Sequence, residues 1–267
     1  MDNTQKRSTL LLTCMLFGYA FLYIPILSLI IFSFNESKLV TVWGGFSIKW
    51  YAELFKNDQV IDAALLSLRI AAVSATFALA LGTIGGFVLA RIRKFRGKTL
   101  FSGMITMPLI MPEVITGLSL LLLFIAMTDL FGWPQGRGVT TITIAHITFS
   151  MAYVAVVVQS RLHDMDSSVE EAALDLGAKP MKVFFLITLP IIAPALVSGW
   201  LLAFTLSIDD LVISSFVSGP GSTTLPMLIF SKVKLGVSPD INALATIVIL
   251  IVALGLILAT YFGRKKA

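Results

Sequence analysis

The chain has 267 residues, of which 57% are hydrophobic and 13% are charged, and its mean hydropathy is +0.92. This composition excludes an ordinary soluble domain. The formal net charge of +5 does not indicate a nucleic-acid-binding protein, because in so apolar a chain the distribution of charge matters more than its sum.

Six apolar stretches are long enough to cross a membrane, since about 20 residues of helix span roughly 30 Å of hydrocarbon. In chain order they are 9–34, 63–90, 100–127, 139–160, 190–213 and 242–262. We therefore predict an all-α, polytopic membrane protein with six transmembrane helices. Little chain remains for a soluble domain, so residues 1–267 are expected to form a single transmembrane domain.

The first stretch is expected to be an uncleaved helix. It runs without a charge from Ser8 to Phe34, much further than the roughly 7–15 residues of a signal-peptide core. The segment that follows contains the aromatic residues Trp43, Trp50 and Tyr51, which favour the membrane interface, so we expect it to lie along the membrane surface.

The second and third stretches carry residues that predict helix contacts and a break. Gly82 and Gly86 have the small-xxx-small spacing that lets another helix approach closely. Pro108 and Pro112 each remove a backbone donor, which predicts a kink or a delayed helix start. The freed carbonyls and the neighbouring Glu113 should then face protein or water rather than lipid.

Basic residues are unevenly divided between the two sides of the predicted spans. With the N-terminus inside, thirteen lie in inner segments: Lys6, Arg7, Arg91, Arg93, Lys94, Arg96, Lys98, Arg161, Lys179, Lys182, Arg264, Lys265 and Lys266. Six lie in outer segments: Lys38, Lys49, Lys56, Arg137, Lys232 and Lys234. The positive-inside rule therefore places both termini in the cytoplasm. Arg69 falls within the second span, near its outer end.

The inner segment 161–189 is predicted to form a helix, a sharp turn and a second helix. Ser168 and Glu171 have the spacing of a capping box, with Ser168 as the N-cap. Gly177 predicts a left-handed stop, and Pro180 suits the first turn of the next helix. An apolar stripe follows the spacing i, i+3, i+4 and i+7 at Val169, Ala172, Ala173 and Leu176. Such a helix can dock in a partner's groove or lie on the bilayer, and these residues alone leave both alternatives open.

The same loop resembles a known family motif. Glu171, Ala172, Ala173, Gly177, Ile187, Leu189 and Pro190 match, at every spacing, the EAA loop of binding-protein-dependent ABC permeases. The chain resembles that family over almost its whole length. Within the family it is most similar to the polyamine permeases, on the stretches 37–43, 112–119, 207–213 and 215–220.

The resemblance implies a type I ABC importer permease of the bacterial inner membrane. It implies that Glu171, Ala172, Ala173, Gly177, Leu189 and Pro190 couple the chain to an ATPase. The implied partners are a second homologous permease subunit, a cytoplasmic ATPase dimer and a periplasmic polyamine-binding protein. ATP and magnesium would be bound by the ATPase, and this chain would bind no cofactor of its own. The implied substrate is a polyamine, putrescine or spermidine.

Three acidic residues fall inside the predicted spans: Glu113, Asp209 and Asp210. A carboxylate is costly there, by roughly 2.5 to 3.5 kcal/mol at a helix centre, so it normally faces a pathway or a partner. Adjacent residues on a helix point about 100° apart, so Asp209 and Asp210 cannot both face one pathway. One of the two should therefore have a structural partner. Trp200 and Phe204 could offer ring faces to an ammonium group, although packing is the ordinary role of such residues.

Other classes of protein are less well supported by the sequence. An ion-driven secondary transporter would suit the proline-broken stretch but not the EAA loop. An anion permease would need cations in its pathway, although permeases for an opine, sulfate or ferric ion stay open as alternatives. His146 and His163 have no cluster spaced for a metal site, and we predict no Ser/His/Asp catalytic arrangement. We expect neither nucleic acid nor ATP to bind this chain.

Overall fold

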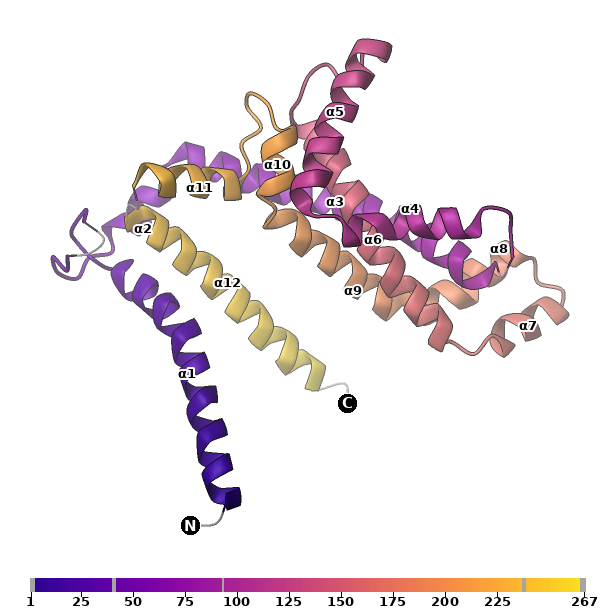
Figure 1. Ribbon diagram of the computed structural model, residues 1–267, viewed down its shortest axis with the longest axis horizontal. Coiled ribbons are helices and arrows are strands. Elements are labelled where there is room, and N and C mark those ends of the chain that lie inside the picture. The colour runs from indigo at the N-terminus through magenta and orange to yellow at the C-terminus, as the bar shows by residue number, and fades with distance from the viewer. Residues whose placement is uncertain (1–2, 40–41, 93, 237–238, 265–267) are drawn as a thin grey trace. The chain divides into compact units, whose positions relative to one another are not determined.

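The computed structural model describes the backbone of residues 3–39, 42–92, 94–236 and 239–264, with side chains described between Leu10 and Leu254 (Figure 1). Within these ranges every extended element is a helix, and the only β pairing is an isolated bridge between Asn35 and Phe46. The predicted all-α class is therefore confirmed. Three of the basic residues used to orient the chain, Arg93, Lys265 and Lys266, lie outside the described residues.

The helices fall into two compact units. The first unit, Met1–Ile61 with Ile229–Ala267, contains α1 (Asn3–Phe32), α2 (Lys49–Leu54) and α12 (Pro239–Arg264). The second unit, Asp62–Leu228, contains α4 (Lys98–Ile110), α5 (Glu113–Phe131), α6 (Val139–Asp164), α7 (Ser168–Asp175), α8 (Pro180–Val183), the π-helix η1 (Phe184–Thr188), α9 (Leu189–Ile208) and α10 (Val212–Val217). The boundaries between the units fall within α3 (Asp58–Arg91) and α11 (Leu225–Leu235).

Five described segments are long and apolar enough to cross a membrane. They are Leu10–Phe32, Asp58–Arg91, Glu113–Phe131, Val139–Asp164 and Pro180–Ile208. The sixth predicted span, 242–262, falls in α12, whose described apolar part is only Pro239–Leu254. The number six therefore stays a prediction.

The third predicted stretch, 100–127, is divided between two helices, and the predicted break is confirmed. α4 ends at Ile110 and α5 begins at Glu113, with Met111 extended between them. Pro112 is the N-cap of α5, so the break lies at one of the two prolines that predicted it. A proline there has no N–H to continue α4, and the residue before it disfavours helical geometry.

In the first unit, a buried asparagine organises the loop after α1. The side-chain amide of Asn35 donates to the carbonyl of Val42 at 2.7 Å, and its oxygen accepts from the N–H of Gly44 at 2.8 Å. The indole of Trp50 donates to the backbone oxygen of Asn35 at 2.7 Å, and Trp50 is buried. Trp50 therefore packs inside this unit, and the expected place of the segment along the membrane surface stays a prediction.

In the second unit, α6 is the central helix and packs along α9 (Figure 1). α3 approaches α6 so closely that a Cβ on Gly82 would lie 2.8 Å from the carbonyl oxygen of Met151. A Cβ on Gly86 would lie 2.7 Å from that of Ala155. The predicted small-residue helix contact is therefore confirmed, since only glycine fits at these two positions.

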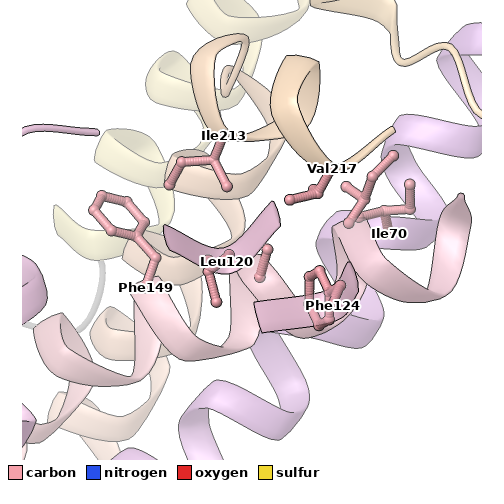
Figure 2. Packing of buried hydrophobic residues seen from close by; sticks show 8 residues of the cluster. Ile70, Leu120, Phe124, Phe149, Ile213 and Val217 are labelled. Carbon is pink, nitrogen blue, oxygen red and sulfur yellow. The ribbon is translucent and has the colours of Figure 1, made fainter. Parts of the chain in front are cut away.

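A core of apolar side chains joins α3, α5, α6 and α10 near the end of α9 (Figure 2). Its labelled members are Ile70, Leu120, Phe124, Phe149, Ile213 and Val217. α10 lies against α5 at Gly117, where a Cβ would come within 2.7 Å of the ring of Phe216. This packing fixes the short α10, and with it the connection from α9, at residues 209–211.

Candidate functional site

The first turn of α7 is closed differently from the predicted capping box. α7 begins at Ser168, so Ser168 is the first helical residue rather than the N-cap, and the N-cap Ser167 forms no side-chain capping bond. The N–H of Ser168 instead donates to the carboxylate of Asp166 at 2.9 Å. The backbone N–H and the hydroxyl of Ser168 hold the pKa of Asp166 below its ordinary value. The capping box with Glu171 is therefore wrong, because the side-chain acceptor comes from Asp166, two residues before Ser168.

The last turn of α7 has the predicted left-handed glycine. Gly177 has φ +85°, its N–H donates to Leu174 at 2.9 Å, and the N–H of Ala178 donates to Ala173 at 3.1 Å. This pair of bonds is a Schellman motif, which satisfies two of the helix's terminal carbonyls. α8 then begins with Pro180 at its first turn, as predicted.

The apolar stripe of α7 is uncovered in the described part of the chain. No residue of α7 is buried. The side chain of Val169 is 45% exposed, and that of Leu176, just past the last residue of the helix, is 90% exposed. Ala172 and Glu171 are exposed, and Ala173 is half-buried. α7 therefore presents small and apolar side chains outward beside an acidic one.

Glu170, which the sequence did not single out, is the residue that ties α7 to the rest of the unit. Its Oε2 lies 2.7 Å from Nε of Arg91, at the end of α3, and its Oε1 accepts a hydrogen bond of 2.5 Å from the hydroxyl of Thr188. Arg91 also donates from Nη1 to the carbonyl of Leu162 at 3.0 Å. Arg91 and Glu170 are 79 residues apart, so no local pattern could have paired them.

Leu189 and Pro190 lie where a π-helical turn passes into α9. The π segment, Phe184–Thr188, directly precedes them. Pro190 has no backbone N–H to donate to a carbonyl of the preceding turn. The wider π-helical turn before it is one way in which a helix accommodates the missing hydrogen bond. α8, the π segment and α9 form one apolar run from Pro180 to Ile208.

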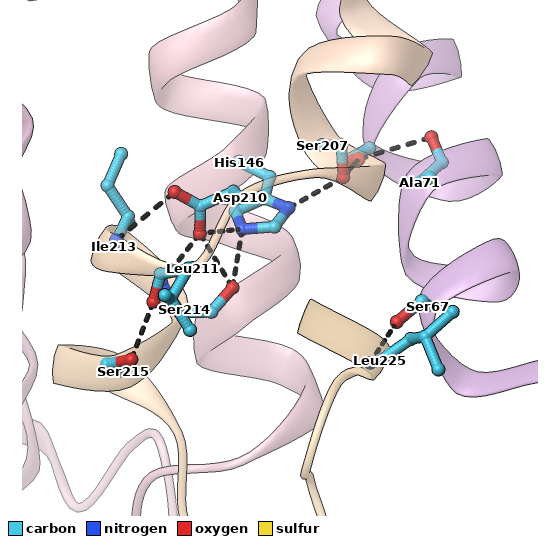
Figure 3. A network of polar contacts seen from close by, with 11 residues as sticks. Ser67, Ala71, His146, Ser207, Asp210, Leu211, Ile213, Ser214, Ser215 and Leu225 are labelled. Atoms are coloured by element: carbon cyan, nitrogen blue, oxygen red, sulfur yellow. Dashed lines mark hydrogen bonds and ion pairs between the residues drawn. The ribbon is translucent and has the colours of Figure 1, made fainter. Parts of the chain in front are cut away.

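Asp209 and Asp210 do not lie inside a helix, which corrects the predicted span 190–213. α9 ends at Ile208, and α10 begins at Val212. Asp210 is enclosed at this break, with only 6% of its side chain exposed. Its Oδ2 accepts from the N–H and the hydroxyl of Ser214, each at 2.7 Å, and Oδ1 accepts from the N–H of Ile213 at 3.2 Å (Figure 3). Asp210 therefore caps α10.

The same carboxylate begins a buried polar chain that crosses three helices (Figure 3). Nε2 of His146 on α6 lies 3.1 Å from Oδ2 of Asp210, and Nδ1 lies 2.6 Å from the hydroxyl of Ser207 on α9. The hydroxyl of Ser74 on α3 donates to Ser207 at 3.0 Å. Each of these four polar side chains therefore has a partner within the protein.

A serine, a histidine and an aspartate thus come together where the sequence predicted no such arrangement. No sequence pattern indicates this arrangement, because the three residues lie on α6, on α9 and in the break after α9. His146 is 2% exposed and Ser207 is 6% exposed, so the hydroxyl is enclosed between α3, α6 and α9. This geometry fastens the helices at the break after α9 and offers no opening for a substrate at Ser207.

Asp209 and Glu113 are the two predicted acids that remain exposed. Glu113 is the first residue of α5, one turn before Gly117, where α10 packs. In the described part of the chain neither carboxylate has an ion pair or a hydrogen bond with another side chain. Arg69, the cation of the second span, is also exposed and borders an apolar groove between α3 and α6.

Trp200 and Phe204 stack on each other on α9, with ring centroids 5.2 Å apart. The indole of Trp200 donates to the hydroxyl of Thr76 on α3 at 3.2 Å, and both rings pack against the core between α3, α6 and α9. Among the described residues, no group of three or more histidine, cysteine, aspartate or glutamate side chains is placed to hold a metal ion.

The fold resembles solved ABC transporters. The chain superposes on a bacterial alginate ABC transporter, in complex with its alginate-bound periplasmic protein, with a TM-score of 0.75 over 98% of this chain and 94% of that one, at 16% identity. It superposes on the MetNI methionine ABC transporter with a TM-score of 0.62 over 78% of this chain and 96% of that one, at 17% identity. At these identities the likeness concerns the fold alone.

Sequence relatives are much closer. The chain is 62% identical to the putrescine transport system permease protein PotI of Escherichia coli (strain K12), over 91% of this chain and 86% of that one. It is 44% identical to the spermidine/putrescine transport system permease protein PotC of the same strain, over 93% and 91%. Residues 82–266 match the profile of a permease family. The chain therefore belongs to the family of binding-protein-dependent transport system inner membrane components.

Proposed function

We propose that this chain is a membrane-spanning permease subunit of an ATP-driven importer, and that it carries polyamines, putrescine foremost, from the periplasm to the cytoplasm. One observation carries the proposal, namely 62% identity to a putrescine permease across 91% of the chain. The identity to a spermidine/putrescine permease is lower, at 44%. The chain is a transport subunit and not an enzyme.

α7 and its turn are the proposed contact with the ATPase. In this proposal the segment 161–189 is cytoplasmic, and Glu171, Ala172, Ala173 and Gly177 present the docking surface. The uncovered stripe of α7 supports this role, since a small-residue face with an acidic edge can enter a groove with basic rims. Leu189 and Pro190 would carry the motion into α9. ATP and magnesium would be bound by the ATPase dimer.

Two further partners complete the proposed assembly: a second, homologous permease subunit and a periplasmic polyamine-binding protein. The solved alginate transporter was crystallised with a substrate-bound periplasmic protein, and the match to it extends over 98% of this chain. That likeness concerns the fold, and membership of a binding-protein-dependent transport family supports the periplasmic partner. A single permease chain would line only part of a pathway, so residues of the second subunit would complete it.

Glu113 and Asp209 are the proposed substrate contacts of this chain. Both are exposed and have no side-chain partner among the described residues, whereas Asp210 uses its oxygens to cap α10. A diammonium substrate needs carboxylates that are free to accept its N–H groups. Trp200 and Phe204 are weaker candidates, since the indole N–H and the ring faces are already engaged on α9 and α3.

Uptake by the whole assembly in proteoliposomes tests the function. With the binding protein, both permeases and the ATPase present, labelled putrescine should accumulate only when ATP is enclosed with the ATPase. Spermidine should compete more weakly, and sulfate, ferric ion and an opine should not compete. Equal accumulation without ATP would contradict an ATP-driven importer. Uptake of one of the other solutes in preference to both amines would contradict the substrate.

A further inference from the structure

Glu170 lies where four elements meet. Its two carboxylate oxygens have different partners: Oε2 pairs with Arg91 from α3, and Oε1 accepts from Thr188 at the end of the π segment. Arg91 in turn donates to Leu162 in the last turn of α6. Glu170 is 13% exposed and Arg91 is 20% exposed, so water screens this pair less than it would a surface pair.

Little else holds α7 in place. No residue of α7 is buried, and beside the pair lies an open hollow of about 480 Å³, bordered by Arg91, Lys98, His163, Glu170 and Glu171 among others. A helix with few buried apolar contacts is easily displaced. The orientation of α7 therefore depends on the bonds of Glu170, together with the Gly177 turn at its other end.

We infer that Glu170, held between Arg91 and Thr188, is a positioning residue that links movement of α7 to α3 and to the start of α9. The inference rests on the proposed function, in which the ATPase acts on α7. When the ATPase shifts α7, the carboxylate pulls on the end of α3 through Arg91 and on the π segment through Thr188. Without the carboxylate, α7 can follow the ATPase while the membrane helices stay in place.

The informative quantity is the amount of putrescine taken up per ATP hydrolysed, measured in proteoliposomes and normalised to intact assembly. Loss of one charge-assisted bond should reduce this ratio about tenfold or more in Glu170→Gln, while ATP hydrolysis continues. Thr188→Val removes the donor with almost no change of shape and should lower the ratio in the same direction. Thr188→Ser keeps the hydroxyl and should retain the parent ratio.

Two further variants separate positioning from simple folding. Arg91→Glu combined with Glu170→Arg restores opposite charges and should recover part of the ratio that each single variant loses. Asp164→Asn removes an exposed acid at the end of α6, which has no described partner, and should behave as the parent.

The outcomes distinguish this inference from the proposed function. If the parent assembly takes up putrescine with ATP but Glu170→Gln and Thr188→Val keep its ratio, the inference is wrong and the function stands. The inference is also wrong if both variants lower only the yield of intact assembly and leave the uptake per ATP hydrolysed unchanged. If Glu170→Gln cannot be assembled, the comparison of Thr188→Val with Thr188→Ser decides. A parent assembly that takes up no putrescine with ATP contradicts the proposed function itself.

Discussion

Asp209 and Asp210 are adjacent in the chain, yet their surroundings are opposite. Asp210 accepts hydrogen bonds from Ile213 and Ser214 and lies beside His146, whereas Asp209 is exposed. An acceptor with several partners is fixed in place, and its carboxylate is not available to a ligand without breaking those bonds. The break between α9 and α10 thus gives one aspartate a structural position and leaves the other free.

Substitution of the two aspartates should therefore have different effects. Asp209→Asn should reduce putrescine transport efficiency roughly tenfold to a hundredfold, because about 1.5 to 3 kcal/mol of a charge-assisted contact is lost. Asp210→Asn should instead lower the yield of intact assembly, because an NH2 group replaces one carboxylate oxygen and at least one buried donor at the α10 cap loses its acceptor, at roughly 1 to 3 kcal/mol. The measurement is uptake competition between putrescine and a singly charged amine, normalised to intact complex.

Glu113→Gln provides a second test of the free carboxylates and should behave as Asp209→Asn does. In both variants the preference for putrescine, which carries two charges, over a singly charged amine should weaken. If both keep the parent's preference, the carboxylates of this chain do not select the substrate. Selection would then lie in the binding protein or the second permease subunit.

At the scale of single elements, α7 depends on the backbone geometry of Gly177. Its φ of +85° is unfavourable for any residue with a Cβ, and most of all for a β-branched one. Nothing lies within 4 Å of a Cβ at this position, so a substitution would act through backbone strain rather than through collision. The turn sets the direction in which the chain leaves α7 for α8.

Gly177→Val should impose a penalty of roughly 1 to 2 kcal/mol at this turn, so that transport falls while the subunit still inserts. Uptake and ATP hydrolysis stimulated by the loaded binding protein are the measurements. Gly177→Asn is the matched variant, because asparagine tolerates a positive φ, and it should retain most activity. Gly132→Val imposes similar strain in open space at the end of α5 and should have little effect. Normal uptake and normal stimulated ATP hydrolysis in Gly177→Val would show that this turn is not needed for coupling.

Features that a few neighbouring residues determine could be predicted from the sequence. The Gly177 turn, the break at Pro112 and the close contact at Gly82 and Gly86 each follow from local backbone chemistry or spacing. The pair of Arg91 with Glu170 could not be predicted, because it forms only after distant segments pack. The capping of α7 by Asp166 was missed for another reason, since Asp166 and Ser168 both offer plausible acceptors and the sequence does not rank them.

The same limit applies to the polar chain through His146. Its members are spread over α3, α6, α9 and the break that follows, so their proximity is a property of the packed unit. The sequence predicted that one aspartate would have a structural partner but could not say which. The structure assigns that role to Asp210, because the end of α9 at Ile208 directs its carboxylate toward the first turn of α10.

At the scale of the whole molecule, function depends on which membrane face carries α7. The proposed ATPase contact requires the segment 161–189 to be cytoplasmic. The uneven division of basic residues favours this orientation, since loops rich in lysine and arginine stay on the cytoplasmic side. The loop from α3 to α4 and the segment around α7 should then lie on one side, and the turn between α5 and α6 on the other.

Single cysteines at exposed positions test this orientation. In a Cys14→Ser background, Lys94→Cys and Asp175→Cys should be protected from an impermeant maleimide added outside intact cells with a permeabilised outer membrane. Arg137→Cys, in the turn between α5 and α6, should react. All three side chains are exposed in the structure, so a difference in labelling reports the membrane side rather than burial. Disruption of the inner membrane should make Lys94→Cys and Asp175→Cys reactive, which controls for masking by a partner. Labelling of these two positions in intact cells, with protection of Arg137→Cys, would place α7 in the periplasm, where no ATPase could reach it.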